Sequence, residues 1–143
     1  MDAERFTTAW DEFFAAVRRA RGRAAQRVKP GTLSLAQFQL LASFDQEQEM
    51  SVSELALAGG VAKPTATRML AGLERDGIVE RHGSDVDRRS VLVRLTPKGR
   101  RMLTAKRDLI TAKQLAIYES LSTTERRQAE SILRRLAVAM EDL

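Results

Sequence analysis

Apolar residues recur every three to four positions near the start of the chain, which gives a helix one apolar face. This spacing predicts a helix over residues 3–28 that carries Phe6, Trp10, Phe13, Phe14 and Val17 on one side. Four of the seven aromatic residues lie here. Two interpretations stay open: the stripe packs into the core of its own chain, or it faces a partner subunit or a ligand cavity. Pro30 ends the helix, because the residue before a proline disfavours the helical conformation.

Three further helix starts share one pattern, a serine followed three residues later by glutamine or glutamate. In this capping box each side chain accepts a hydrogen bond from the other residue's backbone N–H. The pairs are Ser34 with Gln37, Ser51 with Glu54, and Ser122 with Glu125. Gly59-Gly60 ends the helix after Ser51 within about two turns. A helix this short must pack on a neighbour, as the first helix of a helix-turn-helix does.

The next helix begins near Lys63-Pro64 and ends at Gly77. Helical geometry places Ala66, Met69, Leu70 and Leu73 on the core side, and Pro64, Arg68, Ala71 and Arg75 on the opposite side, flanked by Thr65 and Thr67. Arginine pairs with guanine edges, and threonine bonds phosphates or touches a thymine methyl group. This face predicts a helix that reads a major groove of DNA. An ordinary solvated helix face is the alternative.

Two β-branched and apolar segments, residues 78–82 and 90–96, predict a pair of strands. The loop between them, residues 83–89, is rich in turn-forming residues and ends in Arg88 and Arg89. Arginine suits the narrow, electronegative minor groove. Asp87 would repel phosphate, so we expect it to support a neighbouring arginine. A merely solvated charged turn is the alternative.

Thr96 and Pro97 predict the start of another long helix, which runs to about Ser120, and a last helix follows Ser122. The helix-turn-helix and the two strands after it, whose connecting loop is called a wing, form a small module. The apolar stripes of the last two helices and of residues 3–28 exceed what this winged module can cover, which favours association of two copies. We expect an N-terminal dimerisation helix in residues 1–33, a DNA-binding domain in 34–96 and C-terminal dimerisation helices in 97–143. The fold class is mainly α with a small β-hairpin wing (α+β).

Positive charge is unevenly distributed along the 143 residues. Between Lys63 and Arg101 there are ten basic and five acidic residues, so this segment carries the entire net charge of +5. Phosphate binding requires positive charge concentrated on one face. A second basic patch between Arg18 and Lys29 has six basic residues and no acidic one, and it could serve another acidic partner.

The composition narrows the classes of function. The chain has no cysteine and one histidine, His82, which excludes disulfides, thiolate zinc sites and multi-histidine metal sites. Neither a cysteine nucleophile nor a phosphate-binding loop is present, so we expect no enzyme and no cofactor. No apolar run of about 18 residues predicts a membrane span, and the first residues do not read as a signal peptide. We expect a cytoplasmic protein without membrane contact.

Three segments, residues 51–56, 63–68 and 73–81, resemble the reading module of MarR-family transcription regulators. The most specific part is residues 87–99, which resemble that family's wing: an Asp-x-Arg, a strand and a Leu-Thr-x-x-Gly helix entry. The resemblance covers about residues 33–100, and the flanking helices match in order and length. The chain departs from the family at Ala62 and Pro64, where polar residues are frequent, and it lacks the cysteine of oxidant-sensing members.

The resemblance implies a homodimer whose terminal helices interlock and whose two winged modules meet consecutive major grooves. By position it implies DNA contacts for Thr65, Thr67 and Arg68 in the major groove and for Arg89 in the minor groove, with Arg88 as its neighbour and Asp87 as its support. Many family members release DNA when a small phenolic or anionic molecule binds. An effector is therefore implied, although the sequence does not identify the residues of its pocket.

Together these features predict a sequence-specific regulator of transcription that binds double-stranded DNA. The candidate DNA-binding residues are Lys63, Thr65, Thr67, Arg68, Arg75, Arg88 and Arg89. We expect a homodimeric repressor of a pseudo-palindromic operator, released by a small aromatic or anionic effector. The alternative is a winged-helix module that binds proteins and no operator. The localised charge and the wing arginines favour DNA.

Overall fold

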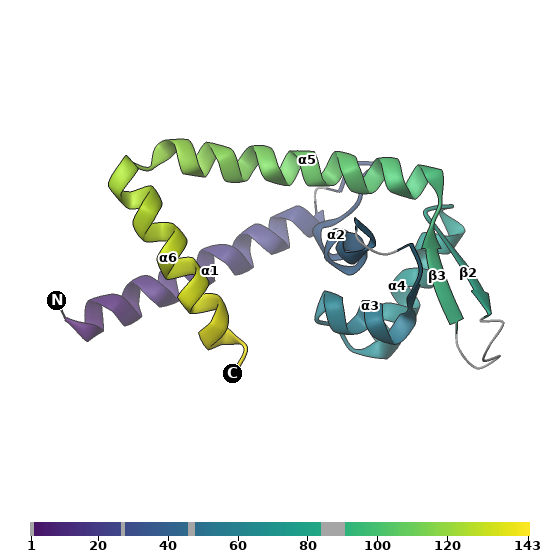
Figure 1. Ribbon diagram of the computed structural model, residues 1–143, viewed down its shortest axis with the longest axis horizontal. Coiled ribbons are helices and arrows are strands. Elements are labelled where there is room, and N and C mark those ends of the chain that lie inside the picture. Colours follow the sequence, from purple (N-terminus) through teal and green to yellow (C-terminus); the bar gives the residue numbers. More distant parts are fainter. Residues whose placement is uncertain (1, 27, 46–47, 84–90) are drawn as a thin grey trace. The chain divides into compact units, whose positions relative to one another are not determined.

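The computed structural model describes residues 2–26, 28–45, 48–83 and 91–143 (Figure 1). Along the chain the elements are α1 (Ala3–Gln26), α2 (Leu35–Leu41), the 3-10 helix η1 (Ala42–Asp45), β1 (Met50–Ser51), α3 (Val52–Gly59), α4 (Lys63–Arg75), β2 (Val79–Gly83), β3 (Val91–Leu95), α5 (Pro97–Ser120) and α6 (Thr123–Met140). The chain divides into two compact units, residues 1–106 and 107–143. The predicted class, mainly helical with a small sheet, is confirmed.

All three predicted capping boxes form. The N–H of the third helical residue donates to the serine Oγ at 3.1 Å in α2, 3.1 Å in α3 and 3.2 Å in α6. Each reciprocal bond, from the serine N–H to the glutamine or glutamate side chain, is also present. These bonds involve residues three apart in sequence, so local sequence alone sets where these helices begin.

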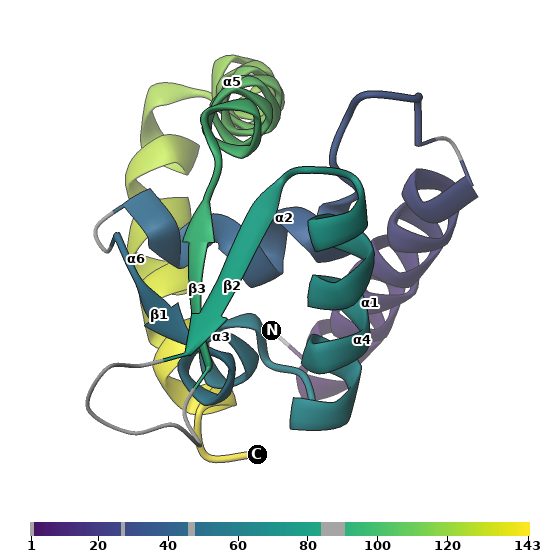
Figure 2. The same cartoon turned by 90° about the vertical axis from the view of Figure 1, so that its right-hand side faces the viewer.

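The sheet has one more strand than the sequence predicts. It is antiparallel in the order β1-β3-β2 (Figure 2). Met50 of β1 pairs with Val93 of β3. The two predicted strands are observed as β2, displaced by one residue, and β3, which ends one residue before the predicted end. β1 has only two residues, which is too short to show an alternating pattern. It forms because β3 offers an unpaired edge beside the start of α3.

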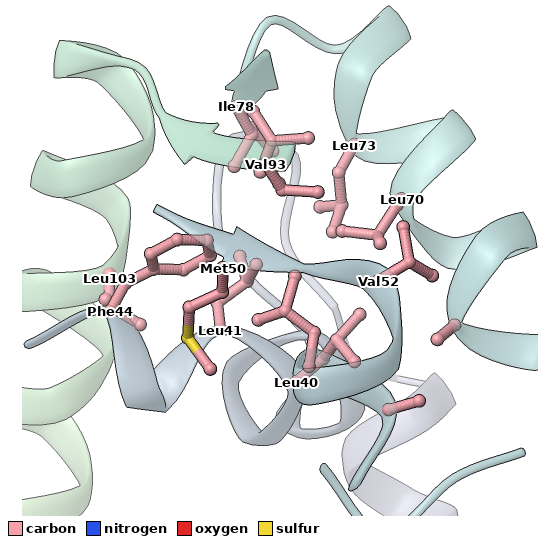
Figure 3. Close-up of a cluster of buried hydrophobic side chains, with 14 of the residues drawn as sticks. Leu40, Leu41, Phe44, Met50, Val52, Leu70, Leu73, Ile78, Val93 and Leu103 are labelled. Carbon is pink, nitrogen blue, oxygen red and sulfur yellow. The ribbon is translucent and has the colours of Figure 1, made fainter. Parts of the chain in front are cut away.

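The hydrophobic core lies within the first unit (Figure 3). Its residues run in sequence from Leu33 to Leu103. Its members come from α2, η1, β1, α3, α4, β2, β3 and the first turns of α5, together with residues of the connecting segments. Phe44 is the aromatic residue of this buried set, and the close-up shows it beside Leu103. Ala66, Leu70 and Leu73 are fully buried, so the predicted core side of α4 is confirmed.

The aromatic stripe of α1 does not enter this core. Phe6 and Phe13 are 60% and 58% exposed, and Trp10 and Phe14 are half-buried. The rings contact one another along the helix, with the centroids of Trp10 and Phe14 4.8 Å apart. The interpretation as core packing within one chain is therefore wrong. The alternative, a stripe that faces a partner or a ligand, stays a prediction.

The second unit, residues 107–143, also keeps its apolar side chains at the surface. No residue of α6 is buried. The exposed apolar residues of the unit include Leu115, Ile117, Ile132, Leu133 and Val138. The turn into α6 is fixed by Arg126, whose Nε donates to the carbonyl of Tyr118 at 2.9 Å and whose guanidinium lies 4.1 Å from the centre of the Tyr118 ring. This unit has a defined turn but no core of its own.

Candidate nucleic-acid interface

A tight turn connects α3 to α4 and sets the direction in which α4 leaves it. Gly60 has φ +65°, in the left-handed region that favours glycine. Its N–H donates to the carbonyls of Ala56 and Leu57, and the Val61 N–H donates to Ala56 at 3.0 Å. These bonds close the end of α3. α3 and α4 pack on each other, as in a helix-turn-helix.

The outer face of α4 carries the predicted contact residues. Lys63, Thr67, Arg68 and Arg75 are exposed, while Thr65 is half-buried. The Thr67 hydroxyl donates to the carbonyl of Lys63 at 3.0 Å. Its proton is therefore engaged, and the side chain presents a methyl group and oxygen lone pairs outward. Such a surface can touch a thymine methyl or accept a bond from a base edge.

The first turn of α4 has no side-chain cap. Ala62 holds the N-cap position with extended backbone angles and cannot accept a hydrogen bond through its side chain. Pro64 lies at the second helical position, and it removes one of the N–H groups that would need a partner. Lys63 adds a positive charge at the same end. An uncapped helix start next to a cation is an environment that favours a phosphate group.

Several of the basic residues between Lys63 and Arg101 form ion pairs or hydrogen bonds within the fold. Arg81 pairs with Glu74, and Arg94 pairs with Glu49. The Lys98 ammonium donates to the carbonyl of Asp76 at 2.8 Å, and the Arg100 guanidinium donates to the carbonyl of Phe44 at 3.3 Å. These four side chains join α4 and the turn after it, η1, the segment before β1, the sheet and the start of α5.

The cations of α4 differ from those four. Among the described residues, no hydrogen bond or ion pair engages the side chains of Lys63, Arg68 or Arg75. A side chain that is exposed and has no partner within the fold is available to a ligand. Arg68 and Arg75 thus share one exposed face of α4, and Lys63 is exposed in its first turn.

Glu49 is a residue that sequence reasoning missed. Its carboxylate pairs with Arg94 of β3 and lies 3.3 Å from Nε2 of His82 on β2. It stands just before β1, and neither partner is near it in sequence. Only the pairing of β1 with β3 brings these groups together. No local signal could have identified this cluster.

The predicted wing residues Asp87, Arg88 and Arg89 lie outside the described residues. The structure defines the two ends between which they run, because β2 ends at Gly83 and β3 begins at Val91 as its antiparallel partner. Contact of these residues with a minor groove stays a prediction.

Within the described residues, no group of three or more acidic, histidine or cysteine side chains could hold a metal ion. In the same residues no helix is both long enough and apolar enough to span a membrane.

Comparison with known proteins gives consistent results. The sequence profile of the MarR family matches residues 33–91. The transcriptional repressor MprA of Escherichia coli is 33% identical over 111 residues, which are 74% of this chain and 61% of MprA. The match thus spans about three fifths of that repressor.

An uncharacterized HTH-type transcriptional regulator of Mycobacterium bovis, Mb0904, is 33% identical over 108 residues, covering 76% of this chain and 73% of the relative. Among solved structures, the transcriptional repressor CouR bound to a 23-mer DNA duplex superposes with a TM-score of 0.69 at 31% identity, covering 85% of this chain and 89% of CouR. The profile match, the identity to Mb0904 and the shared fold agree, and the chain belongs to the MarR family of winged helix-turn-helix transcription regulators.

Proposed function

We propose that this protein is a homodimeric repressor of transcription that binds a pseudo-palindromic operator in double-stranded DNA. The observation that carries the proposal is the set of three exposed cations on α4: Arg68 and Arg75 on its outer face and Lys63 in its first turn, none with a partner among the described residues. The DNA-bound state of the related repressor CouR supports the same assignment. The proposal includes no catalytic activity and places the protein with its DNA in the cytoplasm.

Each residue has a distinct role in the proposal. Arg68 reads base edges in the major groove, while Lys63 and Arg75 bind phosphates at the two ends of α4. Thr65 and Thr67 contact bases or phosphates next to those bound by Arg68. Arg88 and Arg89 of the wing enter the minor groove, supported by Asp87.

The proposed division of the chain follows from the position of the core. In this proposal residues 34–96 form the DNA-binding domain, because most of the buried set lies within them, from Leu40 to Val93, and Leu33 and Leu103 pack onto it from the flanking segments. Residues 1–33 and 97–143 are dimerisation helices in this proposal, because most of their large apolar side chains, Leu33 and Leu103 excepted, are exposed or half-buried in the single chain. Two copies would cover these stripes and present two α4 helices to one operator. Sedimentation equilibrium tests this step, and a monomer at micromolar concentration would contradict it.

The direct test selects binding sites for the purified protein from a random duplex library. We expect a two-fold related site with half-sites about one helical turn apart. Arg68→Ala should relax the base preference at one position in each half-site, and its matched control is Arg134→Ala. Arg134 is an exposed arginine of α6 that pairs with Glu130. Failure to enrich any site, or equal effects of the two variants, would refute the proposal.

Release by a small aromatic or anionic effector is part of the proposed function. A panel of aromatic carboxylates and phenols, added to the operator complex in a gel-shift assay, tests it. At least one compound should release the DNA at a concentration that also raises the melting temperature of the free protein. A panel without such a compound would speak against this class of effector.

A further inference from the structure

One ion pair joins the proposed recognition helix to the hairpin that carries the wing. Glu74 lies in the last turn of α4 and Arg81 lies on β2. Arg81 donates three hydrogen bonds to the Glu74 carboxylate: Nη2 to Oε1 at 3.1 Å, Nε to Oε2 at 3.2 Å, and the backbone N–H to Oε2 at 3.2 Å. Both oxygens of the carboxylate thus accept hydrogen bonds from a single residue of the neighbouring strand.

The pKa values of both partners agree with this geometry. Hydrogen bonds from the Arg81 side chain hold the pKa of the Glu74 carboxyl below its ordinary value. The same bonds raise the pKa of Arg81. A guanidinium that faces a carboxylate in this way forms a planar, bidentate contact that resists rotation. The contact therefore constrains direction as well as distance.

The Glu74–Arg81 pair lies where α4 meets β2, so a small rotation of one element against the other would shift the surfaces proposed to contact DNA. The three residues 76–78 alone separate α4 from β2, and both elements lead to surfaces proposed to contact DNA. The turn of residues 76–78 connects α4 to β2 at one point, and a single connection leaves the angle between them free to change. The Glu74–Arg81 contact is a second connection and restricts that angle. We propose that Glu74 and Arg81 are positioning residues that hold α4 and the β2–β3 hairpin at the angle needed to meet adjacent grooves of one operator.

This inference rests on the proposed function and adds residues to it. Its positive charge alone would suggest that Arg81 binds a phosphate, because it is one of the ten basic residues between Lys63 and Arg101. Its guanidinium is engaged by Glu74, and 28% of the side chain is exposed. An exposed or partly exposed ion pair contributes little to global stability. Loss of the pair should therefore leave the protein folded while changing how it binds DNA.

The experiment compares two acidic residues that differ in their contacts. Glu74→Gln removes the charge from the pair, whereas Glu80→Gln removes the same charge from an exposed residue of β2 for which no side-chain bond is seen among the described residues. Both variants make the protein more positive by one charge per subunit. If only charge matters, both should bind any DNA more tightly.

The quantity measured is the ratio of the dissociation constants for a random duplex and for the selected operator, at one salt concentration. We expect Glu74→Gln to lower this ratio at least about tenfold, the scale of losing one good base contact. Glu80→Gln should leave the ratio within about twofold of the parent. Both variants should melt within a few degrees of the parent. Equal ratios for the two variants would overturn the positioning role.

Arg81 supplies the second arm of the test. Arg81→Lys keeps the charge but loses the planar fork, and Arg81→Met loses both. A positioning role predicts that both variants lose specificity to a similar extent. A direct phosphate contact predicts instead that lysine retains affinity and that methionine gives a shallower salt dependence, and that result would overturn the proposal. A parent protein that binds operator and random duplex alike would refute the proposed function itself, and this role with it.

Discussion

The contact between the start of α5 and the turn before β2 can be tested with one methyl group. Gly99 is buried in the first turns of α5, and a Cβ added there would lie 2.0 Å from the carbonyl oxygen of Ile78. The same carbonyl accepts the Thr96 N–H at 3.0 Å and the Thr96 hydroxyl at 3.1 Å. Gly99→Ala must therefore separate two backbone segments that hydrogen bonds hold together.

The size of the effect follows from these distances. Ordinary contacts begin near 3.4 Å, so the added Cβ is 1.4 Å too close to a backbone atom that cannot rotate away. Overpacking of this kind costs roughly 1–3 kcal/mol, and each hydrogen bond lost with it costs about 1 kcal/mol. We expect Gly99→Ala to lower the free energy of unfolding by roughly 3 kcal/mol. For a protein of this size that lowers the melting temperature by about 10 °C.

Gly22→Ala is the matched control. Gly22 lies in the last two turns of α1, and a Cβ there would meet nothing within 4 Å. Alanine is favoured over glycine in a helix by about 1 kcal/mol, so this variant should melt slightly higher than the parent. Thermal unfolding followed by circular dichroism measures both variants. If Gly99→Ala melts within about 2 °C of the parent, the close approach of α5 to Ile78 is wrong.

Four further predictions concern α4 and the wing. Ala62→Ser should cap α4 and raise the free energy of unfolding by about 1 kcal/mol in chemical denaturation; no gain would mean that the first-turn N–H groups are already satisfied. Lys63→Ala removes two phosphate contacts per dimer, so the slope of log K against log salt should become shallower by about 1.8. Arg89→Ala should weaken operator binding with a shallower salt slope, and unchanged affinity would refute the wing assignment. In an NMR titration Arg81→Met should raise the lowered pKa of Glu74 toward its ordinary value, because the side-chain hydrogen bonds and the guanidinium charge are lost. Because that pKa is lowered in the folded state, the pair stabilises the protein above the unfolded pKa of Glu74. The stabilisation is lost as the pH falls through the lowered value.

Signals that act over three or four residues predicted most of the helical module. The capping boxes of α2, α3 and α6 and the glycine after α3 specify helix ends through bonds to near neighbours. The buried side of α4 follows equally from helical geometry, because one side carries small and aliphatic residues and the other carries cations. Sequence reasoning therefore placed these elements and their outward faces correctly.

Features that depend on distant partners were not predictable in this way. Glu49 and Arg94 are 45 residues apart in sequence, and only the pairing of β1 with β3 brings them together. The stripe of α1 has the spacing of a core helix, yet Phe6 and Phe13 stay exposed in the single chain. Periodicity shows that a face is apolar but not which surface covers it.

The distribution of cations shows why a charge count over a segment is a coarse guide to a binding surface. The count between Lys63 and Arg101 treats every basic residue alike, but the fold uses Arg81 and Arg94 to join secondary-structure elements. A substitution at those positions should alter the geometry of the module. A substitution at Arg68, which has no partner among the described residues, should alter base preference alone. The two groups of variants should thus separate in one experiment: loss at Arg68 is confined to one base position in each half-site, whereas loss at Arg81 lowers discrimination across the whole site.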